Sequence, residues 1–184
     1  MITELDAIGA SRVAAVLLEP VAGLSGIRLP DHYLRELREY RDRHGILVIF
    51  DEVFSGMGRM GPMFAAEFSG VSPDLLCLSK ALIAGYAPLS AVLATDAVYQ
   101  AFDAPMAYFA AASSTDAHPI SCAAGAQTLR ALTEGSELEQ GVAVGQRLGS
   151  LLTAELASQP LVEQIRVIGP YVAIDVKTPR ISWR

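Results

Sequence analysis

The chain has 184 residues, which is enough for one globular domain with a buried core. Hydrophobic residues make up 52% and charged residues 18%, a balance that excludes a disordered chain. The net charge of −6, without any block of Lys or Arg, excludes a nucleic-acid or anionic-membrane partner. No apolar stretch is long enough to span a membrane and residues 1–12 lack a secretory pattern, so we expect a cytoplasmic protein.

The first 130 residues alternate apolar runs with helical patterns. Residues 21–29 hold three turn formers and are expected to form a loop. A helix is predicted from Pro30 and Asp31 to a C-cap at Gly45. Buried strands are predicted over residues 12–18, 46–50, 75–78 and 89–93. This alternation predicts an α/β domain with a mostly parallel sheet.

The second part of the chain has a different pattern. Two long helices are predicted over residues 119–132 and 138–157, and the loop 133–136 between them is a predicted domain boundary. Residues 162–168 and 172–176 are predicted to form paired strands around Gly169-Pro170.

Two cysteines, Cys77 and Cys122, lie in apolar sequence without CxxC spacing. We expect both to be small core residues in a reducing cytosol, with neither a metal site nor a disulfide.

Asp51 and Lys80 each follow a predicted strand, at the carboxyl end where α/β sheets bind ligands. A carboxylate there can keep a heterocyclic nitrogen protonated, as pyridoxal phosphate requires. A partly buried lysine there can act as a nucleophilic amine and a proton shuttle. The simpler interpretations are a helix N-cap or turn former for Asp51 and a solvated strand end for Lys80.

The surrounding motifs resemble the core of the class III pyridoxal-phosphate-dependent aminotransferases. Upstream, LLEPVAGLSGIRLP resembles the family's Glu-Pro segment, and downstream, AHPISCAAGAQTL resembles its His-Pro helix. The resemblance covers residues 13–132 in order and at matching spacing. The central motifs are Asp51-Glu52-Val53, Gly58-Arg59, Pro73-Asp74, Lys80 and Gly85-Tyr86-Ala87-Pro88-Leu89.

The resemblance implies a fold type I transferase. Residues 1–133 would be the central part of the large, cofactor-binding domain, with a mostly parallel sheet flanked by helices. Residues 134–184 would be a linking helix and the start of the small C-terminal domain. A homodimer with cofactor sites at the interface is also implied.

By resemblance, Asp51 pairs with the pyridinium nitrogen, Val53 packs on the ring face, and Lys80 holds the cofactor as a Schiff base. Ser114, with Thr115 adjacent, would bind the cofactor phosphate, often in the neighbouring subunit's site. The alternative for this segment is a polar loop that leads into a helix.

Glu19 would line the substrate side of the site, where relatives pair this residue with an arginine. Its alternative is a strand-end carboxylate in a turn. The substrates would be a small-molecule amino donor and a carbonyl acceptor.

The sequence also departs from the family pattern. Phe54 stands where many relatives have glutamine, and Met60 replaces a threonine. CLSKAL, and FSG after Asp-Glu-Val, resemble the members like 7,8-diaminopelargonate synthase.

Family chains are much longer than this one. This chain begins after their glycine-serine phosphate loop and ends before their C-terminal substrate arginine, so we expect an incomplete aminotransferase. An aminomutase, racemase or decarboxylase on the same fold would share Lys80 and Asp51 and stays open. A catalytically inactive remnant also stays open, and a large uncovered apolar patch would favour it.

Overall fold

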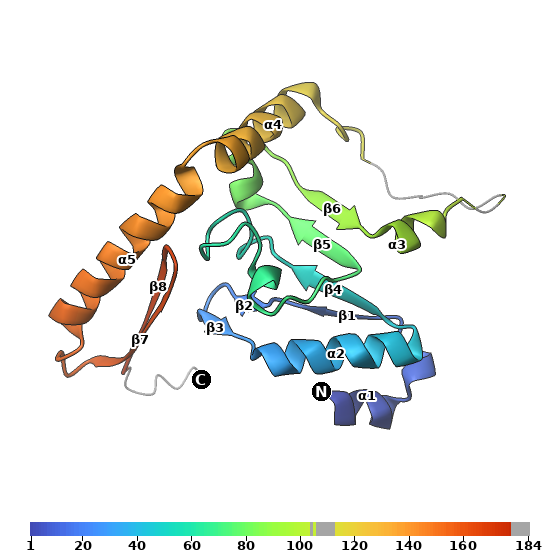
Figure 1. The fold of residues 1–184 in the computed structure, drawn as a ribbon, viewed down its shortest axis with the longest axis horizontal. Coiled ribbons are helices and arrows are strands. Elements are labelled where there is room, and N and C mark those ends of the chain that lie inside the picture. The colour runs from blue at the N-terminus through green and yellow to red at the C-terminus, as the bar shows by residue number, and fades with distance from the viewer. Residues whose placement is uncertain (104, 106–112, 178–184) are drawn as a thin grey trace, which may run out of the picture.

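The computed structural model describes residues 1–103, 105 and 113–177. Its centre is a sheet of four strands in the order β1-β4-β5-β6, and the first two pairings are parallel (Figure 1). The prediction of an α/β fold with a mostly parallel sheet is therefore confirmed. The strands are β1 (Ala15–Leu18), β4 (Leu47–Asp51), β5 (Leu75–Leu78) and β6 (Ala91–Ala94).

The last pairing, between β5 and β6, is antiparallel. Its connection, residues 79–90, contains only the short 3₁₀ helix η3 (Lys80–Ile83). The connection thus lacks the α-helix that usually returns a chain to a parallel neighbour. The chain therefore reverses direction directly after Lys80.

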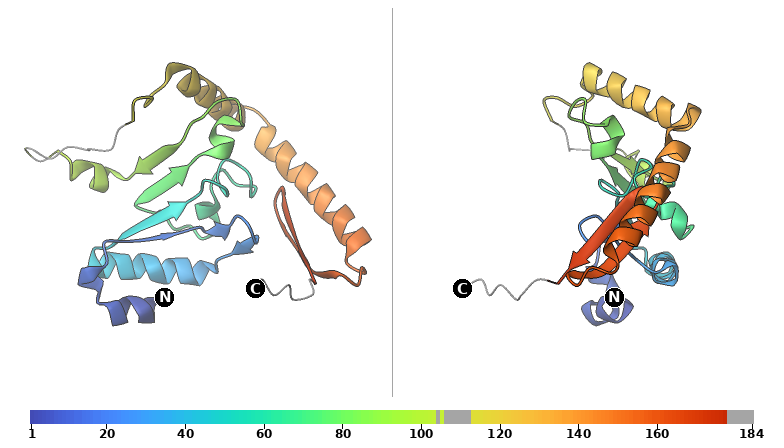
Figure 2. Two further views of the ribbon diagram at one scale, coloured as in Figure 1. Left: turned by 180° about the vertical axis from the view of Figure 1, so that it is seen from behind. Right: turned by 90° about the vertical axis from the view of Figure 1, so that its left-hand side faces the viewer.

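Helix α2 (Asp31–His44) covers one face of the sheet, and α1 (Ile2–Ile8) lies beside it (Figures 1 and 2). Leu37 and Tyr40 of α2 pack in one cluster with Val48 and Phe50 of β4, and all four are almost completely buried. Gly45 ends the helix in the left-handed conformation with φ 71°, which confirms the predicted C-cap.

The opposite face of the sheet is open among the described residues. Strand register pairs Asp51 with Cys77 and Cys77 with Val92, and paired residues share a face. Leu17, which is paired with Ile49, lies on this face too. Leu17 is 62% exposed and Val92 is 64% exposed. Asp51 thus lies on the face that α2 does not cover.

The segment predicted as a loop between residues 21 and 29 contains a small antiparallel pair, β2 (Val21–Ala22) and β3 (Ile27–Arg28). Short helices that the sequence pattern did not predict complete this part of the chain. They are α1, η1 (Ala10–Arg12), η2 (Ala65–Phe68) and α3 (Asp96–Gln100).

Helices α4 (Pro119–Glu134) and α5 (Glu137–Leu156) form an arm that leaves the sheet, with the hairpin of β7 (Val162–Ile168) and β8 (Tyr171–Val176) beside α5 (Figures 1 and 2). The predicted helix pair and the predicted paired strands are confirmed. On α4, only Ser121 and Gly125 are buried. Cys122 is exposed because burial on α4 is confined to Ser121 and Gly125, so the prediction that it is a core residue was wrong.

None of the described helices is both long and apolar enough to cross a membrane. Over residues 1–103, 105 and 113–177, no three His, Cys, Asp or Glu side chains lie close enough to hold a metal ion together.

Candidate functional site

Asp51 and Lys80 lie at the same edge of the sheet. Asp51 is the last residue of β4, and Lys80 comes two residues after the end of β5, which runs parallel to β4. The side chain of Asp51 is half-buried and accepts a hydrogen bond from the Val53 N–H at 3.0 Å. The turn after β4 therefore fixes the direction of this carboxylate.

The carboxylate also affects its strand neighbour. Burial, together with the negative charge of Asp51, raises the pKa of the Cys77 thiol. The thiol accordingly stays protonated and uncharged at neutral pH, as a half-buried strand residue.

Lys80 begins η3 with φ 43°, in the left-handed region that a non-glycine residue rarely adopts. Its Nζ lies 5.2 Å from the centre of the Phe54 ring. The side chain is exposed, so the expected partial burial of this lysine is not found. The surroundings of the amine that the structure describes are therefore solvent and the Phe54 ring.

A groove of about 610 Å³ runs along Lys80. Its walls are mostly apolar and come from the loop after β4, from η3 and from α4. The lining residues are Met57, Arg59, Lys80, Ala81, Ala84, Gly85, Thr128 and Leu132. A volume of this size falls in the range of small-molecule sites.

Arg59 adds an unused donor to this groove. Its Nε is buried and has no hydrogen-bond partner within the described part of the chain, and its guanidinium lies 4.9 Å from the Phe54 ring centre. A buried donor without a partner is costly, and an anionic or carbonyl ligand would satisfy it. An amine, an unused Arg N–H and apolar walls fit a flat anionic cofactor such as pyridoxal phosphate.

Glu19 lies in the turn between β1 and β2 and is exposed. Its Oε2 accepts a hydrogen bond from the Gly23 N–H at 2.8 Å. Gly23 packs directly on Phe54, because a Cβ at Gly23 would lie only 2.5 Å from the Phe54 Cγ. Glu19 is therefore linked to Lys80 only through two intervening residues, Gly23 and Phe54.

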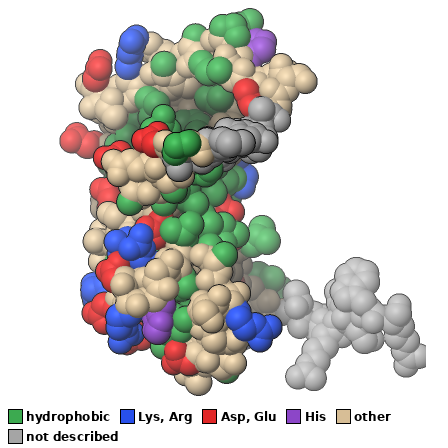
Figure 3. All heavy atoms as spheres, turned by 90° about the vertical axis from the view of Figure 1, so that its right-hand side faces the viewer, with side chains coloured by type: hydrophobic (Ala, Val, Ile, Leu, Met, Phe, Trp, Pro, Cys, Tyr) green, Lys and Arg blue, Asp and Glu red, His purple; other side chains and the backbone are tan. Residues whose placement is uncertain are grey.

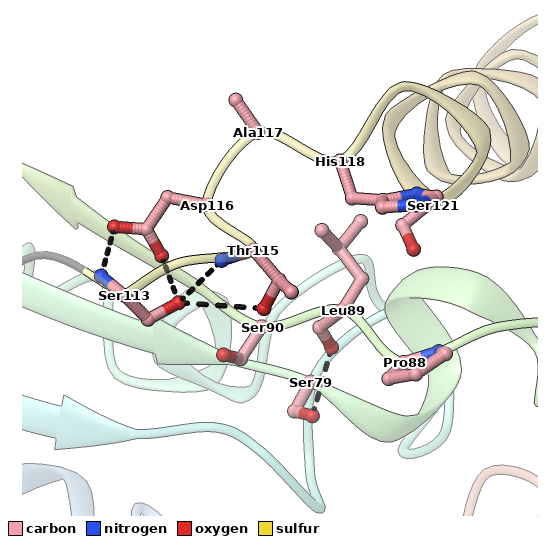
Figure 4. A pocket seen from close by; sticks show the side chains of 10 residues that line it. All are labelled: Ser79, Pro88, Leu89, Ser90, Ser113, Thr115, Asp116, Ala117, His118 and Ser121. Carbon is pink, nitrogen blue, oxygen red and sulfur yellow. Dashed lines mark hydrogen bonds between the residues drawn. The ribbon is translucent and has the colours of Figure 1, made fainter.

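Ser114 and Thr115 lie in the loop before α4, away from the Lys80 groove, whose walls contain neither residue. Thr115 lines a second, polar hollow of about 380 Å³ (Figure 4). Ser79, adjacent to Lys80 in the chain, lines it too. The structure thus brings Thr115 near the backbone beside Lys80 but separates it from the Lys80 side chain.

The loop in this hollow is held by its own hydrogen bonds. The N–H and O–H of Ser113 donate to Asp116 at 2.7 and 2.8 Å, and the two bonds lower the pKa of Asp116 (Figure 4). Ser113 Oγ lies 3.5 Å from Thr115 Oγ1. The hydroxyl groups are consequently presented on an ordered turn directly before α4.

Two buried carboxylates, Glu52 and Asp74, hold the segments around the site. The sequence motifs include both, but they predicted no structural role for either. Glu52 is 1% exposed and accepts N–H bonds from Ala65 and Ala66 at 2.6 and 2.8 Å. Burial raises its pKa although these bonds oppose the shift. Alternation along β4 was the available signal, because Glu52 continues the inward positions of Val48 and Phe50.

Asp74 is the second buried carboxylate, with 2% of its surface exposed. It accepts two hydrogen bonds from Arg41, at 2.6 and 3.0 Å, and one from the Val48 N–H at 2.8 Å. Burial alone would raise the pKa of Asp74, but the bonds from Arg41 and Val48 lower it overall. Asp74 thereby joins α2 to the sheet just before β5.

Comparison with known protein families gives a match over nearly the whole chain. A family model described as aminotransferase class III matches residues 1–182. An omega-aminotransferase of Caulobacter vibrioides is 47% identical over 130 residues, which are 68% of this chain and 29% of that protein. A putrescine aminotransferase of Pectobacterium atrosepticum is 38% identical over 174 residues, covering 93% of this chain and 36% of that protein. The chain spans about a third of the length of these relatives.

Solved transaminase structures have the same fold. An amine transaminase from an uncultivated Pseudomonas species, in its PLP-bound form, is 33% identical with a TM-score of 0.89 over 97% of this chain and 41% of its own. A taurine:2-oxoglutarate aminotransferase from Bifidobacterium kashiwanohense, in complex with PLP and glutamate, is 29% identical with a TM-score of 0.87, over 95% of this chain and 39% of its own. The predicted fold type I architecture is confirmed.

Proposed function

Because this chain belongs to the class III aminotransferases, a family that depends on pyridoxal phosphate, we propose that it forms the cofactor-lysine part of a transaminase. The reaction would move an amino group from an amine or amino acid donor to a keto acid or aldehyde acceptor. The observation that supports this most is the pair of Asp51 and Lys80 at adjacent parallel strand ends, with a groove along Lys80.

Pyridoxal phosphate, when bound, supplies an electron sink for the carbon that loses its proton. We assign Lys80 Nζ to hold the cofactor and to accept and return that proton. Asp51 would keep the ring nitrogen protonated, and Val53 would pack against the ring and exclude water. Ser114 and Thr115 would bind phosphate in the neighbouring subunit's site, since the Lys80 groove of their own chain contains neither.

The proposed substrate class rests on the position of Glu19 and on the names of related enzymes. Glu19 would border the substrate. The relatives named as an omega-aminotransferase, a putrescine aminotransferase and a taurine aminotransferase favour a terminal primary amine as donor. The likeness of CLSKAL and FSG to 7,8-diaminopelargonate synthases favours a diamine product instead. We further propose a cytoplasmic homodimer, because the phosphate residues lie outside the Lys80 groove and a second copy would bring them to it.

An inactive remnant is the second candidate, and the open face of the sheet favours it. Leu17 and Val92 are more than half exposed there, beside Asp51. Elsewhere, hydrophobic side chains gather across the middle of the side of the molecule that Figure 3 shows, which is the right-hand side of Figure 1. A cofactor site without a cover on the open face of the sheet would retain its ligand weakly.

Borohydride trapping tests whether Lys80 binds the cofactor. The purified chain is mixed with pyridoxal phosphate, reduced, digested and mapped by mass spectrometry. The sequence has only two lysines, Lys80 and Lys177, so Lys177 is an internal control. We expect the pyridoxyl group on Lys80 in large excess over Lys177, and equal labelling or none on Lys80 would overturn cofactor binding.

The activity itself is tested without borohydride. Alanine, putrescine and taurine are added separately to the cofactor-bound chain, and the cofactor absorbance is followed. We expect at least one donor to convert the cofactor to its amine form, and Lys177→Arg to leave the rate unchanged. Trapping on Lys80 without conversion by any amino donor, including 7,8-diaminopelargonate, would support the inactive remnant.

A further inference from the structure

Phe54 stands at the meeting point of four parts of the molecule. Two cations lie by its ring, Lys80 Nζ at 5.2 Å and the Arg59 guanidinium at 4.9 Å from the ring centre. Tyr171 of β8 meets it edge-on, with ring centres 5.6 Å apart. Gly23 of the turn after β2 lies against it so closely that no Cβ would fit there.

The contacts with Tyr171 and Gly23 limit the movement of the Phe54 ring. The Tyr171 hydroxyl donates to the Gly23 carbonyl at 3.1 Å, so the hairpin and the turn that hold Phe54 are bonded to each other. Phe54 also packs on the buried cluster of Val21, Met60 and Ala65. A ring held on several sides offers a fixed π surface to a flexible amine, whereas Lys80 itself is exposed.

A cation over an aromatic face is attracted by the negative charge of the π system. Arg59 and Lys80 reach the same ring from different segments, the loop after β4 and η3, so the ring lies beside both cations. The Phe54 ring thus lies within reach of the Lys80 ammonium on one side and in contact with Tyr171 of the hairpin on another.

We propose that Phe54 is a positioning residue, which holds the free Lys80 amine at the groove and couples its position to the docking of the β7–β8 hairpin. The catalytic meaning of this contact rests on the proposed function of Lys80. The contact itself exists without cofactor and can be measured without it.

The test is the competitive acetylation of Lys80 and Lys177 in the cofactor-free chain, quantified by mass spectrometry. Phe54→Leu removes the π surface and keeps an apolar side chain, so the ratio of Lys80 to Lys177 labelling rates should rise about threefold. Phe54→Tyr keeps the ring and should restore the parent ratio. A ratio in folded Phe54→Leu equal to that of the parent overturns the proposal.

Phe68→Leu is the matched control. Phe68 packs on the same cluster and has its own cation, Arg28, at 4.4 Å from its ring centre. The same substitution there should leave the labelling ratio unchanged. An equal rise in Phe68→Leu would mean general loosening and would also overturn the proposal.

Gly23→Ala is the second variant, for the case that circular dichroism shows Phe54→Leu to be unfolded. The added Cβ would displace the Phe54 ring without removing it. The labelling ratio should rise in this variant too, and an unchanged ratio overturns the proposal. If Phe54→Leu raises the labelling ratio as expected but pyridoxal phosphate cannot be trapped on Lys80 of the parent chain, only the proposed function is contradicted.

Discussion

Asp74 illustrates how single buried charges hold the frame around the site. Its buried carboxylate accepts hydrogen bonds from Arg41 and from the Val48 N–H at once. Removal of one partner of a buried pair leaves the other charge uncompensated. Removing one partner therefore lowers the free energy of unfolding by more than the intact pair contributes to it.

We expect Asp74→Ala to lower the free energy of unfolding by about 2–3 kcal/mol at pH 7, measured by urea denaturation. The lowered pKa of Asp74 fixes the pH dependence. The stabilisation is present above the ordinary pKa of 3.8 and is lost as the pH falls through the lower folded-state value. The difference between parent and variant should therefore narrow in acid below about pH 3.8.

Asp42→Ala is the control for this prediction. Asp42 also pairs with Arg38 and Arg41, both at 3.2 Å, but its side chain is 52% exposed. An exposed pair contributes only about 0–1 kcal/mol. Equal losses in the two variants would contradict the special role of the buried carboxylate.

The sequence predicted the residues whose surrounding motifs are specific, and it missed those whose role depends on packing. The edge position of Asp51 and Lys80 follows from two apolar runs that each end before them. The exposure of Cys122 was not foreseen, because an apolar neighbourhood in sequence does not reveal which side of a helix is covered. The contact between Lys80 and Phe54 joins two loops and has no pattern in sequence.

At the scale of elements, strands and long helices were predicted within a few residues. Residues 75–78 and 162–168 coincide with β5 and β7. Short elements such as α1 and α3 were missed, since five to seven residues give too little periodicity. The antiparallel direction of β6 was missed because an apolar run carries no sign of its direction, and a connection as long as residues 79–90 permits either one.

Helix α5 meets the hairpin through glycines spaced four residues apart. A Cβ at Gly145 would overlap Pro170, and one at Gly149 would lie 2.6 Å from Val167 Cγ1. A Cβ at Gly141 would meet nothing closer than Pro170 Cγ at 3.8 Å, an ordinary contact. The close approach of helix and hairpin thus depends on Gly145 and Gly149 but not on Gly141.

We expect Gly145→Ala to lower the free energy of unfolding by about 1–3 kcal/mol, because backbone atoms of the hairpin must move. Gly141→Ala should raise it, by up to about 1 kcal/mol, since alanine favours the helix. Thermal denaturation of the two variants measures both effects. A stabilised Gly145→Ala would mean that the helix and hairpin do not pack as described.

At the scale of the whole molecule, contacts join segments more than 140 residues apart. Arg166 of β7 donates to the Ser25 carbonyl at 2.6 and 3.0 Å and pairs with Asp175. The bonds from Arg166 to Ser25 and from Tyr171 to Gly23 cross the predicted boundary at residues 133 and 134. The division into a large domain and the start of a small domain stays a prediction.

Arg166→Ala should loosen the hairpin while the sheet stays intact. Loss of the bonds to Ser25 and Asp175 should speed native-state hydrogen exchange in β7 and β8 about tenfold. Exchange in α2 should not change. Arg147→Ala, an exposed position on α5, is the control, and uniform acceleration across the chain would contradict a local tie.

The left-handed backbone of Lys80 has a consequence for protein engineering. A side chain at φ 43° costs on the order of 1 kcal/mol, and glycine would relieve it. A library screened for yield or heat resistance alone would therefore enrich Lys80→Gly and discard the amine. Engineering of this chain therefore needs a screen that detects the Lys80 amine itself, because stability favours glycine at this position and the proposed chemistry requires lysine.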